Sequence, residues 1–88
     1  MHRLGNLMHH TRMVLGMARS TGTDVVQAYD EGDLSQEDWA SMVQACRGCG
    51  WADRCEDWLD DHRDVPCAPE TCPNREKFKA LKVRAAQR

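Results

Sequence analysis

Five cysteines in a chain of 88 residues, and the spacing of four of them, are the strongest chemical signal in the sequence. Three follow the pattern C-x2-C-x5-C and the fourth opens a Cys-Pro-Asn triplet; the four are Cys46, Cys49, Cys55 and Cys72. A thiolate is a soft, charged ligand, and four that converge on one point can bind zinc or an iron–sulfur cluster. The sequence therefore predicts a metal site with these four cysteines as its ligands.

The spacing favours iron–sulfur over zinc. Structural zinc sites usually pair two C-x2-C knuckles, and this chain has one, at residues 46–49. Cys72 precedes a proline, as the last cysteine of the bacterial ferredoxin run does. A four-iron cube is wider than one ion and accepts ligands from more scattered elements. We expect a [4Fe-4S] cluster, with Zn²⁺ as the alternative and disulfides or free thiols as a third interpretation.

The fifth cysteine and the histidines are weaker candidates. Cys67 lies in a proline-flanked loop and could replace Cys72, but Cys72 has the following proline and the expected helix start. About 10 Å of helical rise separates His62 from Cys55, so we expect a core histidine rather than a ligand. The other histidines are expected on the surface: His2, His9 and His10.

The sequence contains no catalytic motif. It has no glycine-rich phosphate loop and no serine elbow, and residues 30–33 lack the residue order of a calcium loop. Four cysteine ligands would also leave no iron open to a substrate. We therefore expect a non-catalytic redox or iron sensor, or an electron carrier. The alternative is a zinc-stabilised helical adaptor for protein–protein interaction.

The elements that must position the cysteines are helices. Near the N-terminus the expected apolar stripe comprises Leu4, Leu7, Met8, Thr11, Val14, Leu15 and Ala18. Gly22 ends that helix, Thr23 can cap a short second helix, and Gly32 stops it. There is no β-pattern, so we predict an all-α fold in a single domain of residues 1–88. Its architecture would be a small bundle of four to five short helices around the cysteine metal site.

The later helices carry clearer signals. Ser35 and Asp38 form the pattern of a capping box, and the apolar stripe that follows ends in Cys46. Cys55 leads the inward face of the next helix, and Cys72 opens the last one, where Pro73 suits the first helical position. The helix N-termini are expected to lower the pKa of the thiols of Cys55 and Cys72. Three tryptophans are expected to shield the core and the cluster: Trp39, Trp51 and Trp58.

The charge distribution and the small size of the chain bear on its partners and on how its core is stabilised. Thirteen of the fourteen acids lie in residues 24–70, whereas residues 75–88 hold six basic residues and one acid. A solvated helix face is the simpler interpretation of the basic segment, so we expect a protein partner, with nucleic acid as the weaker alternative. A chain this short has a marginal core, which a metal can supplement.

The longest apolar run, residues 13–18, is too short for a signal peptide or a membrane span. We therefore expect a cytoplasmic protein with reduced thiols and no membrane association.

The triplet C-x2-C-x5-C, followed by an amphipathic helix, resembles the three-cysteine segment of the WhiB-like regulators over residues 46–59. Those proteins bind a [4Fe-4S] cluster with this triplet and a fourth cysteine, so the resemblance implies ligation by Cys46, Cys49 and Cys55. In that family the fourth cysteine lies upstream and a Gly-Val-Trp-Gly-Gly turn follows the triplet. Here the fourth cysteine lies downstream and the turn is missing, so transcription-factor binding is not implied.

Taken whole, the sequence resembles a group of short, uncharacterised proteobacterial proteins. The shared pattern is Leu-Ser-x-Glu-Asp-Trp at residues 34–39, Cys-x-Gly-Cys at 46–49, Cys-x-x-Trp-Leu at 55–59 and Cys-Pro-Asn at 72–74. This resemblance spans most of the chain and implies no established activity.

Overall fold

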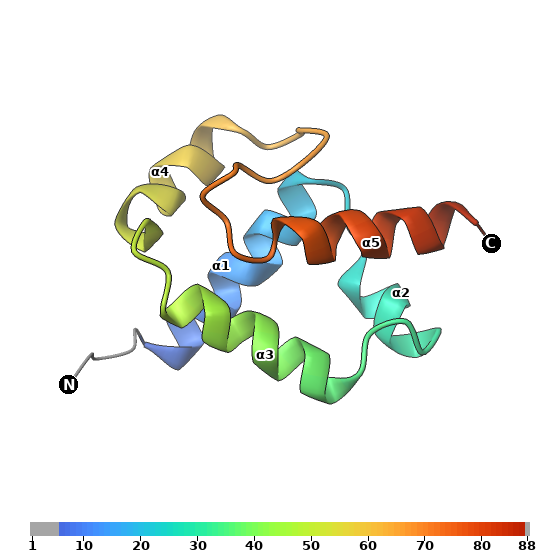
Figure 1. Cartoon of the computed structure of the whole chain (residues 1–88). Helices are drawn as coiled ribbons and strands as arrows, with labels where there is room; N and C mark the ends of the chain where they lie inside the picture. Colours follow the sequence, from blue (N-terminus) through green and yellow to red (C-terminus); the bar gives the residue numbers. More distant parts are fainter. Residues whose placement is uncertain (1–5, 88) are drawn as a thin grey trace.

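Between residues 6 and 87 the chain folds into five helices, as the sequence predicts (Figure 1). The computed structural model describes these residues, apart from the side chains of residues 52 and 53. The helices are α1 (Leu7–Ser20), α2 (Val25–Asp30), α3 (Gln36–Arg47), α4 (Ala52–Asp61) and α5 (Arg75–Ala86). Within the described residues all regular secondary structure is helical, so the predicted all-α fold is confirmed. None of these helices combines the length and apolarity that a membrane crossing requires.

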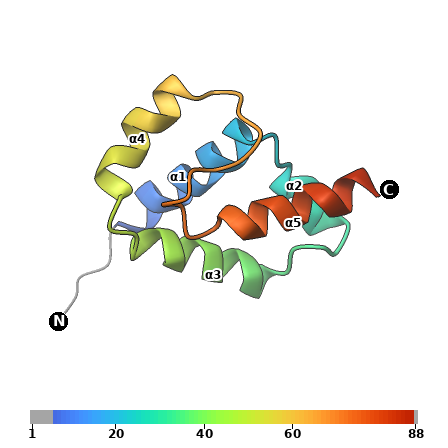
Figure 2. The ribbon, with the colours of Figure 1, turned by 45° about the horizontal axis from the view of Figure 1, so that its top comes forward.

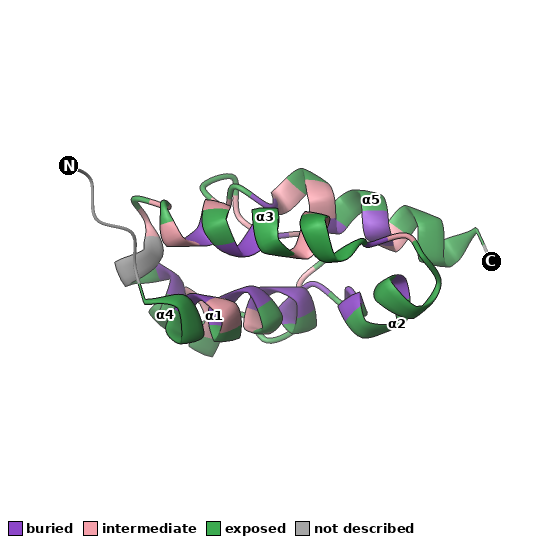
Figure 3. Cartoon of the chain, turned by 90° about the horizontal axis from the view of Figure 1, so that it is seen from below, coloured by how far each residue is buried: buried purple, intermediate pink, exposed green. Residues whose placement is uncertain are grey.

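The helices form two layers. Figure 3 shows α3 and α5 in one layer and α1, α2 and α4 in the other, with buried residues on the sides that face each other. α1 contacts both α3 and α4, and α2 contacts α5. The long loop after α4 crosses over α1 before it enters α5 (Figure 2). The Val65 N–H donates to the Ser20 carbonyl at 2.8 Å, and this bond fixes the loop to the end of α1.

Side-chain caps define where α2 and α3 begin. Ser35 and Asp38 form the predicted capping box at the start of α3, each side chain accepting from the other's backbone N–H. The predicted cap of α2 is wrong, because Asp24 directly precedes the helix and its side chain accepts from a backbone N–H of the first turn. Thr23 is buried instead, and its hydroxyl lies 2.9 Å from that of Thr21.

Two glycines stop the first two helices where the sequence predicts. Gly22 has φ +70° just after α1, and Gly32 has φ +82° just after α2. A side chain at either position would be strained by this left-handed backbone conformation, which glycine adopts without penalty.

The core lies between the layers, and the inward stripe of α1 differs from the predicted one. Met13, Val14, Met17 and Ala18 are buried there. Three residues of the predicted stripe are exposed: Leu7, Met8 and Leu15. The reason is that α1 is covered on two sides, by α3 and by α4, so its buried stripe includes the methionines. Leu4 lies outside the described residues.

α5 begins later than the sequence predicts. Its first residue is Arg75, and Pro73 lies in the preceding turn. The Arg75 N–H donates to the Cys72 carbonyl at 3.2 Å, which closes that turn. The buried Asn74 side chain donates to the Met42 carbonyl of α3 at 2.8 Å. The turn before α5 is therefore tied to α3 by a side-chain bond.

Candidate metal centre

The four cysteines of the predicted quartet line one pocket between the layers. They are Cys46, Cys49, Cys55 and Cys72. The other lining residues are Asn74 and a mainly apolar set: Met13, Val14, Met17, Trp51, Pro73 and Phe78. Four helices and two turns therefore contribute to one site. Cys67 lies outside this lining. The four cysteines that line the pocket are the four chosen from their spacing in the sequence. That these cysteines bind a metal stays a prediction.

Local structure explains how each thiol reaches the pocket. Cys46 lies in the last turn of α3 and is 9% exposed, and Gly48 caps that helix. The Cys49 N–H donates to the Cys46 carbonyl at 3.1 Å, so Cys49 follows in a tight turn. Cys55 lies in the first turns of α4 and is 8% exposed. Cys72 enters from the turn before α5, after the loop has crossed α1.

Burial dominates the acidity of these thiols. It raises the pKa of Cys46 to about 11 and that of Cys55 to about 12, and it also raises the pKa of Cys72. Repulsion between the neighbouring thiolates adds to each of these shifts. The predicted lowering at Cys55 and Cys72 is therefore wrong, because loss of hydration outweighs the helix dipole and Cys72 precedes α5 by three residues. A metal would have to displace the protons of these thiols.

Backbone groups contact two of the four sulfurs. A hydrogen bond from the backbone of Asn74 lowers the pKa of Cys72 and opposes part of the effect of burial. The Cys49 Sγ lies 3.9 Å from the Thr71 carbonyl oxygen. Both contacts come from the turn before α5, which therefore supplies polar groups as well as a thiol to the pocket.

A histidine contacts the third sulfur. His10 Nδ1 lies 3.4 Å from the Cys46 Sγ, and His10 is only 6% exposed, so its predicted surface position is wrong. Burial, followed by the nearby charges of His9 and Arg47, lowers the pKa of His10. His9 is exposed, as predicted, and its Nε2 lies 2.9 Å from a Glu56 carboxylate oxygen. His2 lies outside the described residues.

His62 lies on the surface and not in the core, so that prediction is wrong. α4 ends at Asp61, and His62 is the residue just past its end, where the helical period no longer directs it inward. Its Nδ1 lies 2.8 Å from the Trp58 carbonyl oxygen, and its ring stacks on the Trp58 indole at 4.4 Å between centroids.

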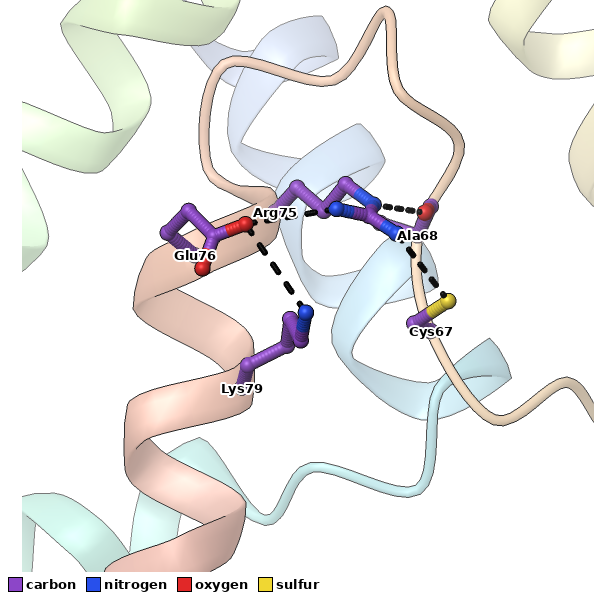
Figure 4. A network of polar contacts seen from close by, with 5 residues as sticks. All are labelled: Cys67, Ala68, Arg75, Glu76 and Lys79. Carbon is purple, nitrogen blue, oxygen red and sulfur yellow. Dashed lines mark hydrogen bonds and ion pairs between the residues drawn. The ribbon is translucent and has the colours of Figure 1, made fainter.

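Cys67 has a separate environment in the loop before α5 (Figure 4). Arg75 Nη2 lies 3.7 Å from the Cys67 Sγ, and Arg75 Nε donates to the Ala68 carbonyl at 3.0 Å. Arg75 also pairs with Glu76 at 3.2 Å, and Lys79 lies 3.9 Å from the same carboxylate. The guanidinium of Arg75 thus lies between this thiol and the first turn of α5.

The chemistry of the donor set fits a metal centre, but the space between the thiols is narrow. The pocket walls leave room for about one water molecule. Among the described side chains, no three from His, Cys, Asp and Glu are grouped closely enough to hold one ion. A four-iron cube would require the surrounding side chains to turn outward.

The fold and the pocket define a small all-helical protein in which four cysteines line one pocket. The chain belongs to a family of unknown function (DUF6455), whose model matches residues 1–84. Comparisons with curated proteins and with solved structures give no significant match. Membership of such a family agrees with the resemblance of the whole sequence to proteins without an established activity. The resemblance to the WhiB-like regulators stays a prediction.

Proposed function

We propose that this protein is a small, non-catalytic [4Fe-4S] protein that acts as a redox or iron sensor or as an electron carrier. One observation supports the proposal above all: Cys46, Cys49, Cys55 and Cys72 line the same pocket although they come from different helices and turns. Four thiolates complete the ligand set of a cubane cluster, so a substrate would find no open iron. Electron transfer needs no open iron, which makes it the function that suits this ligand set.

The rest of the pocket suits such a cluster. Two methionines, Val14 and Phe78 are buried on its walls, and Trp51 is partly buried. Apolar walls exclude water and lower the local dielectric, and both effects help to set the potential of a metal centre. The glycine-flanked turn at residues 48–50 lets the backbone approach a cluster closely.

The test is metal analysis after anaerobic purification. The proposal expects a brown protein with broad absorption near about 400 nm and about four irons and four sulfides per chain. Serine at any of the four quartet positions should reduce bound iron. Cys67→Ser is the matched control, because Cys67 lies in the loop that leads to Cys72 yet outside the pocket. A colourless protein with one zinc per chain would reject the proposal, and equal iron loss in the Cys67 variant would reject the ligand assignment.

A zinc-stabilised helical adaptor is the second candidate. One observation favours it: an apolar groove elsewhere on the molecule offers a surface for a partner. Leu15, Val25, Val26, Tyr29, Leu34 and Trp39 line that groove. Val26 is 67% and Tyr29 52% exposed there. In this case a chelator should unfold the protein and release about one zinc per chain.

We propose a protein as the partner in either case. Two of the basic side chains of α5 are engaged within the molecule: Lys77 lies 3.6 Å from Asp38, and Arg84 lies 3.7 Å from Asp33. These pairs reduce the charge that α5 can offer to phosphates, so nucleic acid is the weaker alternative. Salt-dependent retardation of DNA or RNA would favour it. The free thiols accord with a reducing compartment such as the cytoplasm.

A further inference from the structure

We propose that this protein forms a symmetric homodimer, and that the apolar groove lined by α1, α2 and α3 is the surface where the second copy binds. The residues that line the groove lie outside the cysteine pocket, so the dimer does not depend on a bound metal. It goes beyond the function proposed above, because it gives this groove a specific occupant.

The groove gathers apolar side chains that water would otherwise surround. Of the six large hydrophobic side chains exposed on the described residues, three line it: Leu15, Val26 and Tyr29. Trp39 of α3 is partly buried beside them. A second hollow shares Leu15 and Val26 and extends this surface toward the end of α1. Contiguous apolar surface of this kind marks an interaction site, and tyrosine and tryptophan are enriched in protein interfaces.

The two edges of the groove carry opposite charge. On α1, the exposed Arg12 and Arg19 lie three residues before and four residues after Leu15, so the three side chains share one face. On α2, the exposed Asp30 follows Val26 by four residues and lies on the same face as that valine. The α1 edge is therefore basic and the α2 edge is acidic.

These opposite edges decide the kind of partner. Residues 24–38, which supply most of the groove, contain six acids and no base. On the α1 side, none of the ion pairs among the described residues includes Arg12 or Arg19. A uniformly basic or uniformly acidic partner would meet like charge along one edge. A second copy presents both edges, and a two-fold axis along the groove places the basic edge of each copy over the acidic edge of the other.

The test is the mass of the reduced full chain, measured by analytical ultracentrifugation over a range of concentrations. A reductant is needed because the five free thiols could otherwise join two chains. We expect the wild-type mass to rise from one chain to two as the concentration increases. Val26→Asp places a charge inside the groove and should raise the dissociation constant at least about tenfold. Val83→Asp is the matched control on α5, where Val83 is 56% exposed outside the groove, and should leave the constant unchanged.

Charge exchange tests the symmetry of the contact. Arg12→Glu together with Arg19→Glu makes both edges acidic, and Asp30→Arg makes both edges basic. Each of these variants alone should dimerise at least about tenfold more weakly, because the facing edges then carry like charge. An equimolar mixture of the two should form a mixed dimer with nearly the wild-type constant, because every edge again faces its opposite.

Three outcomes would overturn the proposal: a wild-type mass of one chain up to about 1 mM, equal effects of Val26→Asp and Val83→Asp, or a mixture of the charge variants that does not associate. Far-UV circular dichroism checks that each variant is folded. If Val26→Asp does not fold, Tyr29→Asp takes its place, since Tyr29 is 52% exposed in the same groove. Iron and zinc play no part in these measurements, so a failure of the metal proposals would leave the dimer standing, and the reverse also holds.

Discussion

Replacement of Phe78 by alanine tests the packing that encloses the cysteine pocket. Phe78 lies on the inward side of α5, is 1% exposed, and is among the largest fully buried side chains of the described residues. It also lines the pocket beside the thiols. Alanine would remove the ring and leave a cavity where α5 meets the core.

The expected cost is large for a chain of this size. Phenylalanine-to-alanine substitutions in a core cost about 3–5 kcal/mol. At about 0.05–0.15 kcal/mol per residue, a domain of 88 residues has a total free energy of unfolding of about 4–13 kcal/mol. Phe78→Ala should therefore remove at least about a quarter of the free energy of unfolding, and most or all of it if the wild-type value lies at the lower bound.

The free energy of unfolding is measured by urea titration of the metal-free protein, with unfolding monitored by far-UV circular dichroism. A reductant is needed because the five cysteines are free. Val83→Ala on the same helix is the matched control: Val83 is 56% exposed, so its truncation should change stability by no more than about 0.5 kcal/mol. A loss below about 1 kcal/mol in Phe78→Ala, or equal losses in both variants, would refute the burial of α5 described here.

Three further substitutions probe other parts of the fold. Asn74→Ala removes the buried bond to the α3 backbone carbonyl and should cost about 1–3 kcal/mol in urea unfolding, because that carbonyl loses its side-chain donor; an unchanged midpoint would count against the bond. Gly32→Ala forces a side chain into a left-handed conformation and should cost about 1–2 kcal/mol, whereas Gly50→Ala, which meets nothing within 4 Å, should not. The bonds from Ser35 lower the pKa of Asp38 below its usual 3.8. The stabilisation from Asp38 is therefore present above that value and lost as the pH falls through the lowered pKa, so the stability difference between wild type and Asp38→Asn should shrink in acid. A difference that stays constant with pH would contradict this linkage.

The local signals of α3 were sufficient to predict its position and its inward face. Ser35 and Asp38 mark its start, Gly48 marks its end, and Cys46 closes the buried stripe between them. Each of these features depends on residues within one or two turns, which is the range over which capping and helical period act. Cys55 could be placed inward for the same reason.

The rest of the site depends on contacts between distant segments. His10 was predicted on the surface because it falls largely on the side of the helix opposite the expected apolar stripe, yet it shares a helical stripe with Met13, Val14 and Met17 at i, i+3, i+4 and i+7. That spacing was a usable signal, and the methionines were the residues that marked it. The start of α5 could not be predicted, because the Asn74 bond to α3 is a tertiary contact that no local pattern reveals.

The arrangement of the pocket has a consequence for the order in which it can assemble during synthesis. Three of its thiols lie within ten residues of one another, but its walls come from α1 at one end of the chain and from α5 at the other. A chain synthesised at about 5–20 residues per second releases α1 first, then the triplet, and only afterwards Cys72 and α5, which complete the pocket. The thiols of Cys46, Cys49 and Cys55 are therefore open to solvent, and to any delivery factor, until Phe78 has left the exit tunnel.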